Sequence, residues 1–210
     1  EQAFKSLMTN TADLIDLEMC AFLIGKTAYP DLNIQAAHHH LETIISGLQQ
    51  QWDTDLSHKE SIYKINEYLF HDLGFKGNTR DYYDPNNSFL HQVLERRVGI
   101  PISLSVLYLL IGQRLNVPVI GIGLPGHFMV GLQTESVLID CFNQGRLLTQ
   151  KDCAKFLQRH SVEFEARYLE PTPNHHIIAR MLRNLIAIYQ KRDEPKQGDR
   201  FQRLLSIAEG

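Results

Sequence analysis

Apolar side chains recur every three or four residues through much of the first hundred positions, a spacing typical of helices with one buried face. The repeat covers residues 14–24 and 34–48. A third helix is predicted over 57–72, where Ser57 and Glu60 have the spacing of a capping box. The first part of the chain is therefore expected to be helical.

A polar segment at residues 77–87 interrupts this pattern, and its Pro and Asn residues predict a long surface loop. Loops of this length often carry function. Ser88 is expected to cap a helix that runs through Arg97. Pro101 then suits the first turn of a strongly apolar helix over 102–115, which we expect to be central and buried.

The pattern next becomes that of strands, which are short, rich in β-branched residues and followed by turns. Strands are predicted over 117–122, 127–133 and 136–142, and a tight turn at Thr134-Glu135 joins the last two. Helical spacing returns over 149–159, 174–191 and 197–209. The order of helices, a compact antiparallel sheet and further helices predicts an α+β fold. Its expected parts are an N-terminal helical region (1–76), a central core (77–170) and a C-terminal helical pair (171–210).

The predicted hairpin brings a histidine and an aspartate together. A turn at Thr134-Glu135 sets Met129 opposite Asp140 and places His127 diagonally across from that aspartate, on the same face. The opposite face is almost wholly apolar, so it is expected to face the core, with Cys141 as a buried thiol. A carboxylate beside an imidazole holds one tautomer and stabilises its protonated form, as a general base requires. His127 and Asp140 are therefore candidate catalytic residues.

Such a pair needs a nucleophile, and the nearest hydroxyl has two interpretations. Ser103 is in the first turn of the helix that begins near Pro101, where unpaired backbone N–H groups are also able to hold an oxyanion. This makes Ser103 a candidate nucleophile. A serine at a helix start more often acts as a cap, and Ser103 is then a structural residue.

Composition and charge narrow the class of protein. With 43% hydrophobic and 21% charged residues, the chain has the balance of a water-soluble globular protein. A formal net charge of -3 gives no overall attraction to nucleic acid or anionic membrane, and no stretch approaches the ~18 apolar residues of a membrane span. The three cysteines have no C-x-x-C spacing, so neither disulfides nor a zinc site is predicted, and a reducing cytoplasm fits best.

Two histidine clusters are weak candidates for a metal site. The histidines at 38–40 are adjacent within a predicted helix, so their side chains point in different directions and cannot all reach one ion. His175 and His176 are also adjacent, without carboxylates or cysteines at ligand spacing. No metal is predicted. No cofactor is predicted either, because the glycines around 121–126 lack the pattern of a nucleotide loop.

Several longer motifs resemble one known family. They are Asn87-Ser88-Phe89-Leu90, the run from Arg97 to Leu104, Pro125-Gly126-His127-Phe128 and Ile139-Asp140. These motifs resemble the transglutaminase-like superfamily, and within it an uncharacterised bacterial subfamily described as invasion-gene regulators; a related region occurs in a vertebrate F-box protein. The resemblance implies a papain-like or transglutaminase-like core of helices and a small antiparallel sheet, followed by tetratricopeptide-like helices. A single pair of such helices cannot bury its face alone, so it must pack on the main domain, or the natural chain continues beyond Gly210.

The resemblance also assigns roles to residues. His127 matches the catalytic histidine of the superfamily and Asp140 its aspartate, whereas Pro101 stands at or near the position of the nucleophilic cysteine. The resemblance thus implies a triad without its nucleophile. The matching motifs also supply the residues predicted to line a cleft at this site, which are Asn87, Ser88, Pro101, Pro125 and Gly126.

Two functions follow from this reasoning. The first is a regulatory or interaction protein built on a degenerate hydrolase fold, with a protein or peptide as its expected partner. Its His127 cleft is then either vestigial or used to bind a peptide or small ligand. The second is a weak acyl transferase or amidohydrolase in which Ser103 attacks, His127 acts as the base and Asp140 orients it. The missing cysteine favours the first, and the sequence names neither the partner nor the oligomeric state.

Overall fold

The computed structural model describes residues 1–9, 15–53 and 55–210. The N-terminal region is helical, as predicted, and contains α1 (Gln2–Met8), α2 (Leu17–Ala28), α3 (Ile34–Gln49) and α4 (His58–Asn66). Leu14, at the start of the first predicted helix, lies outside the described residues. The predicted capping box is present, because the Ser57 N–H donates to the Glu60 carboxylate at 2.9 Å and the Glu60 N–H donates to the Ser57 hydroxyl at 3.3 Å.

Four strands form one antiparallel sheet in the order β3-β4-β5-β6. They are β3 (Val119–Ile122), β4 (Met129–Leu132), β5 (Glu135–Asp140) and β6 (Arg146–Leu148), of which β6 was not predicted. Val130 pairs with Ile139 and Gly131 with Leu138, which is the predicted register. The turn lies one residue earlier than predicted, at Gln133-Thr134, and a bulge after Gly131 absorbs the difference.

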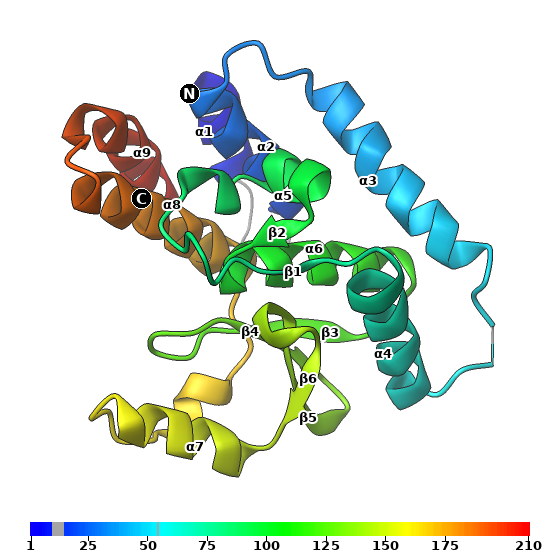
Figure 1. Cartoon of the computed structure of the whole chain (residues 1–210). Coiled ribbons are helices and arrows are strands. Elements are labelled where there is room, and N and C mark those ends of the chain that lie inside the picture. The colour runs from blue at the N-terminus through cyan, green and yellow to red at the C-terminus, as the bar shows by residue number, and fades with distance from the viewer. Residues whose placement is uncertain (10–14, 54) are drawn as a thin grey trace.

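The apolar helix predicted to be central is found at the centre. It is α6 (Pro101–Arg114), and it follows α5 (Leu90–Arg96). Helices α2, α5 and α8 (Asn174–Lys191) pack on α6, and so do strands β3 and β4. Figure 1 shows α6 running across the middle of the molecule between a group of helices and the sheet. A helix with packed neighbours on so many sides must be apolar nearly all round, which explains its sequence.

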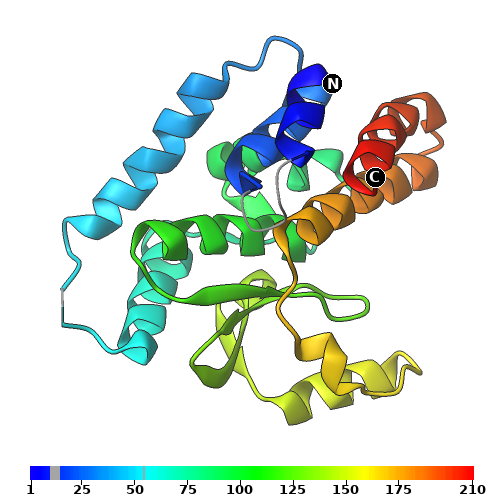
Figure 2. The same cartoon turned by 180° about the vertical axis from the view of Figure 1, so that it is seen from behind.

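The sheet is buried on both faces. Val130 and Ile139 belong to the main core beneath α6, as the alternation of the hairpin predicted. Leu138, on the other face, packs with Cys153 and Leu157 of α7 (Gln150–Arg159). Figures 1 and 2 show α7 on the side of the sheet away from α6. This second covering layer places a helix next to the strand ends that carry His127 and Asp140.

The C-terminal residues form a helical pair, as predicted. Helix α8 packs against α9 (Pro195–Ala208), and the pair packs on α1 and α2 rather than extending away from the domain. One hydrophobic core includes Leu41, Leu107 and Leu182, which come from the three predicted regions. Residues on both sides of the boundaries predicted near 76 and 170 thus share one core.

Three local features differ from the predictions. The helix predicted through 72 leaves the α-helical geometry after α4 and continues as a π-helical segment, Glu67–Asp72. Phe89, not Ser88, is the N-cap of α5, because the preceding loop ends in a tight 3₁₀ turn, Pro85–Asn87, that leaves Ser88 buried. A short parallel pairing of β1 (Lys76–Gly77) with β2 (Val98–Gly99) was not predicted.

Among the described helices, none combines the length and the apolar character that a membrane span requires.

Candidate functional site

His127 and Asp140 meet at one end of the β4–β5 hairpin. The Nε2 atom of His127 lies 2.9 Å from the Oδ1 atom of Asp140, which is hydrogen-bonding distance. The prediction that these side chains share a face is confirmed, although the strands are shorter than predicted: His127 precedes β4 and Asp140 ends β5. Both side chains are largely buried, with 11% and 8% of their surface exposed.

Asp140 is fixed by the turn that follows β5. In the 3₁₀ turn Cys141–Asn143, the side-chain amide of Asn143 donates to Asp140 Oδ2 at 2.7 Å and its backbone N–H donates to Oδ1 at 3.3 Å. Burial by itself opposes the charge of Asp140, but the hydrogen bonds from His127 and Asn143 together outweigh it and hold the pKa of Asp140 below its usual value. Asp140 is therefore a carboxylate at neutral pH, and both of its oxygens are engaged.

His127 is positioned by a turn and by a distant arginine. Its backbone N–H donates to the Leu124 carbonyl at 3.0 Å, and Gly126 takes a φ of 75°, in the left-handed region that favours glycine. From α8, Nη2 of Arg180 donates to the carbonyls of Leu124 at 2.8 Å and of His127 at 2.7 Å. The direction of the imidazole thus depends on a residue 53 positions further along the chain.

The second ring nitrogen of His127, Nδ1, makes no hydrogen bond with any described residue. The ring instead lies beside Phe156 of α7, with the two ring centroids 5.6 Å apart. The Phe156 ring in turn lies beside the His160 ring, with their centroids 4.7 Å apart. When Nε2 carries the proton of the neutral ring and donates it in a hydrogen bond to the Asp140 carboxylate, Nδ1 carries the lone pair. That atom is able to accept a proton or a hydrogen bond from a ligand.

Comparison with known proteins identifies the family. The family model of the transglutaminase-like superfamily matches residues 35–183. A UPF0162 protein of Xylella fastidiosa (strain 9a5c) is 34% identical over 194 residues, which are 89% of this chain and 69% of that protein. The chain belongs to the UPF0162 family of the transglutaminase-like superfamily.

A eukaryotic protein is also similar. F-box only protein 21 of Mus musculus is 32% identical over 169 residues, which are 75% of this chain but 25% of that protein. The similarity therefore concerns one part of the F-box protein. No solved structure matches the chain.

The three cysteines of this UPF0162 protein are free and buried. Burial, followed by the charges of Asp152 and Asp140, raises the pKa of Cys153 to about 11. Burial likewise raises the pKa of Cys20 to about 12 and that of Cys141 still further. No hydrogen bond joins any of these thiols to His127 in the described chain. At neutral pH these thiols are therefore almost wholly protonated.

Ser103 lies in a cap. Its hydroxyl donates to the Asn87 carbonyl at 2.6 Å and accepts from the Ile100 N–H at 3.1 Å, and the residue is 0% exposed. These bonds close the first turn of α6, which is the structural interpretation that the sequence allowed. None of the hydrogen bonds of Ser103 within the described residues reaches His127.

Only part of the predicted cleft is open. Pro125 and Gly126 lie at or near the surface, in the turn before His127. Asn87, Ser88 and Pro101 are buried instead. The side-chain amide of Asn87 donates to two backbone carbonyls of the 77–87 loop, at 2.7 and 3.3 Å, so it fastens this loop and does not face a ligand.

Asn143, Phe156 and Arg180 shape the site, and sequence reasoning missed all three. Asn143 had a usable signal, because an asparagine soon after a strand-ending aspartate is typical of a tight turn. Arg180 had a weaker one, since it is a single charge between the buried Ala179 and Met181 of α8. Phe156 had none, because nothing local in the sequence places α7 beside the hairpin.

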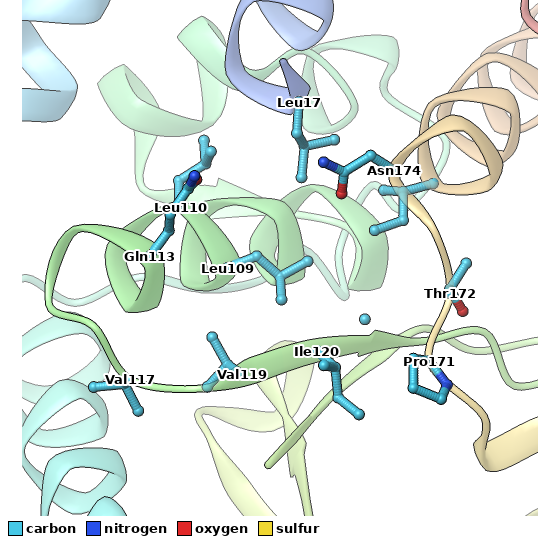
Figure 3. A pocket seen from close by; sticks show the side chains of 12 residues that line it. Leu17, Leu109, Leu110, Gln113, Val117, Val119, Ile120, Pro171, Thr172 and Asn174 are labelled. Carbon is cyan, nitrogen blue, oxygen red and sulfur yellow. The ribbon is translucent and has the colours of Figure 1, made fainter. Parts of the chain in front are cut away.

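A cavity of about 340 Å³ lies between α6, β3 and the start of α8, away from His127. Figure 3 shows its apolar walls, which include Leu109 and Ile120, and its polar groups, which include Gln113 and Asn174. The amide of Asn174 already donates to the Ile15 carbonyl at 2.9 Å. We assign no ligand to this cavity.

The histidine run contributes to one acidic cluster. Nδ1 of His38 lies 2.5 Å from the Glu18 carboxylate, and Glu42 offers a third possible metal ligand nearby. Arg114 forms ion pairs with both Glu18 and Glu42, the latter at 3.0 Å. Since the guanidinium already supplies the positive charge, this cluster is better explained as an ion-pair network than as a cation site.

Proposed function

We propose that this chain is a non-enzymatic, regulatory member of its superfamily that binds a protein or peptide at the His127 site. The observation that carries the proposal is a formed His127–Asp140 pair with no nucleophile bonded to it among the described residues. A base without a nucleophile does not form a covalent acyl intermediate. Pro101, which the family resemblance sets at or near the cysteine position, has no nucleophilic atom.

Two further properties belong to the same proposal. The chain works in a reducing cytoplasm, which is supported by three cysteines that are free and buried. Its C-terminal pair, α8 and α9, is of the tetratricopeptide type and helps to hold the partner. The similarity to F-box only protein 21 supports an interaction role in a eukaryotic context as well, but that protein's activity is not transferred to this chain.

Acyl transfer is the activity to test. The protein is incubated with dimethylcasein and a fluorescent primary amine, and separately with a fluorophosphonate probe. We expect no labelling above that of heat-denatured protein, and no difference between wild type, His127→Ala and His39→Ala, a matched change at an exposed residue of α3. Time-dependent labelling that is lost in His127→Ala and retained in His39→Ala would show catalysis and overturn the proposal.

A further inference from the structure

Two exposed tyrosines and the exposed Lys191 lie near Arg180, the part-buried arginine that holds the His127 backbone. Tyr82 and Tyr83, in the loop after β1, are 37% and 43% exposed, and their rings meet edge to face with centroids 5.3 Å apart. Tyr82 also packs edge-on against Phe142 at 5.9 Å. On the other side, Nζ of Lys191 lies 3.4 Å from the centre of the Tyr83 ring. We call Tyr82, Tyr83, Arg180 and Lys191 the tyrosine–cation surface.

Its two cations lie on one stripe of α8. Arg180 and Lys191 are 11 positions apart, so at about 100° per residue their directions differ by only about 20°. With a rise of about 1.5 Å per residue, the side chains leave the helix roughly 16 Å apart. Asn184 and Ala187 lie between the two cations on the same stripe, and both side chains are too short to cover the surface between them. Figure 1 shows the loop after β1 turning beside α8.

Neither cation is neutralised by a carboxylate within the described ranges, whereas their neighbour Arg183 pairs with Glu209. The guanidinium of Arg180 lies 5.4 Å from the Phe128 ring and donates only to backbone carbonyls. Backbone carbonyls orient the guanidinium, but they do not neutralise its positive charge. Of the acids in the facing loop, Asp84 is paired with Arg96 at 2.7 Å, and Asp81 forms no ion pair with Arg180 or Lys191.

The separation of the charges decides the kind of ligand. A single small carboxylate cannot contact two cations that leave the helix roughly 16 Å apart. Residues i and i+4 of an extended peptide point to the same side about 13 Å apart, and the long side chains at both ends cover the remaining few Å. Exposed tyrosine rings between the cations suit such a chain, because an aromatic ring packs on apolar parts of a peptide while its hydroxyl stays in water.

We propose that the tyrosine–cation surface binds an extended peptide segment with two acidic side chains four residues apart, on the same side of the chain. Arg180 and Lys191 contact the carboxylates, and the rings of Tyr82 and Tyr83 pack on the chain between them. The inference rests on the proposed function, since it names the partner chemistry of the same site: Arg180, which contacts one end of the peptide, also holds the backbone of His127.

Two fluorescein-labelled pools of decapeptides test the surface by fluorescence anisotropy. Both are random except at the third and seventh positions, which are glutamate in one pool and lysine in the other. We expect the glutamate pool to bind and the lysine pool to bind at least tenfold more weakly. Lys191→Gln is expected to weaken glutamate binding about three- to tenfold, and Lys59→Gln, an equal charge change at an exposed residue of α4, to leave it unchanged.

Arg180→Gln also removes a charge, but it breaks two bonds to the backbone, so it is interpreted only if its melting temperature stays near that of wild type. Lys191→Gln carries the test in either case because Lys191 is exposed. Equal binding of both pools, no binding of the glutamate pool at millimolar concentration, or an equal loss in Lys191→Gln and Lys59→Gln would each overturn the inference.

The same samples separate this inference from the proposed function. Mass spectrometry of the peptides after incubation detects cleavage or amine incorporation. Binding with chemical change would overturn the non-enzymatic role and leave the peptide surface standing. No binding and no chemical change would overturn the peptide surface and leave the non-enzymatic role standing.

Discussion

Two compact polar clusters, each made by a loop beside α6, differ in whether all of their polar atoms have a hydrogen-bond partner. We call the first closed and the second open. In the first, Ser103 and Asn87 are 0% exposed and bond only to other parts of the protein. In the second, the Asp140 carboxylate is fully engaged, but His127 keeps 11% of its side chain exposed and one nitrogen without a partner in the described structure. A closed cluster holds the fold, and an open one is available to a ligand.

The closed cluster is expected to have the larger effect on stability, and Asn87→Ala is its strongest test. The substitution leaves the carbonyls of Asp81 and Tyr82 and the amide of Asn78 without their partner in a part-buried place. We expect a loss of about 3 kcal/mol in the free energy of unfolding, measured with urea. Gln158→Ala, at an exposed residue of α7, is the control and is expected to change stability by less than about 0.5 kcal/mol. A loss below about 1 kcal/mol for Asn87→Ala contradicts the closed-cluster interpretation.

Asp140→Asn tests the open cluster and should depend on pH. The folded pKa of Asp140 is lowered, so its charge stabilises the fold fully above the ordinary carboxyl pKa of about 3.9, and this effect is lost as pH falls below that value and through the lower folded pKa. We expect Asp140→Asn to lower the free energy of unfolding by about 2 kcal/mol at pH 7 and by less at pH 3. Asp31→Asn, at an exposed residue, is the control. A difference that stays constant between pH 7 and pH 3 would mean that the charge of Asp140 is not what stabilises the fold.

Ser103→Ala separates the cap from the catalytic pair. Loss of the bonds to Asn87 and Ile100 is expected to lower stability by about 1 to 2 kcal/mol. Ser105→Ala is a matched change in the same buried helix, and its longer bond to the Phe128 carbonyl, 3.4 Å, predicts a smaller loss. Equal losses, or a change in the NMR signals of the His127 ring in Ser103→Ala alone, would contradict a purely structural Ser103.

The His127–Asp140 pair was predictable because strand geometry is local. A side-chain period of two and a tight turn are enough to set the register of a hairpin, and the pairing of Val130 with Ile139 follows from them. The bulge after Gly131 moved the turn by one residue without changing that register. Helices of one buried face were predictable for the same reason, as the limits of α8 at Asn174 and Lys191 show.

Features that depend on distant contacts were not predictable. Arg180 holds His127 across 53 positions, and α7 covers the second face of the sheet through Leu157; neither contact leaves a local pattern in one sequence. Ser88 illustrates the opposite error. Its residue type is typical of a helix cap, but the turn at Pro85–Asn87 moved the start of α5 by one residue, and tertiary packing then decided its environment.

Thiol labelling gives the smallest expected signal. It tests the proposed absence of a nucleophile at His127, because a reactive cysteine would supply one. Burial raises the pKa of all three thiols, so at pH 7.5 almost none is ionised, and folded protein should react with iodoacetamide at least a hundredfold more slowly than unfolded protein. Cys153, whose pKa of about 11 is the lowest of the three, is expected to react first. Cys153→Ser should then remove most of the residual labelling of the folded state. Fast labelling of any cysteine that slows in His127→Ala but not in His39→Ala would mean that the imidazole and the thiol act together. The open cluster would then be a catalytic site and not a binding site.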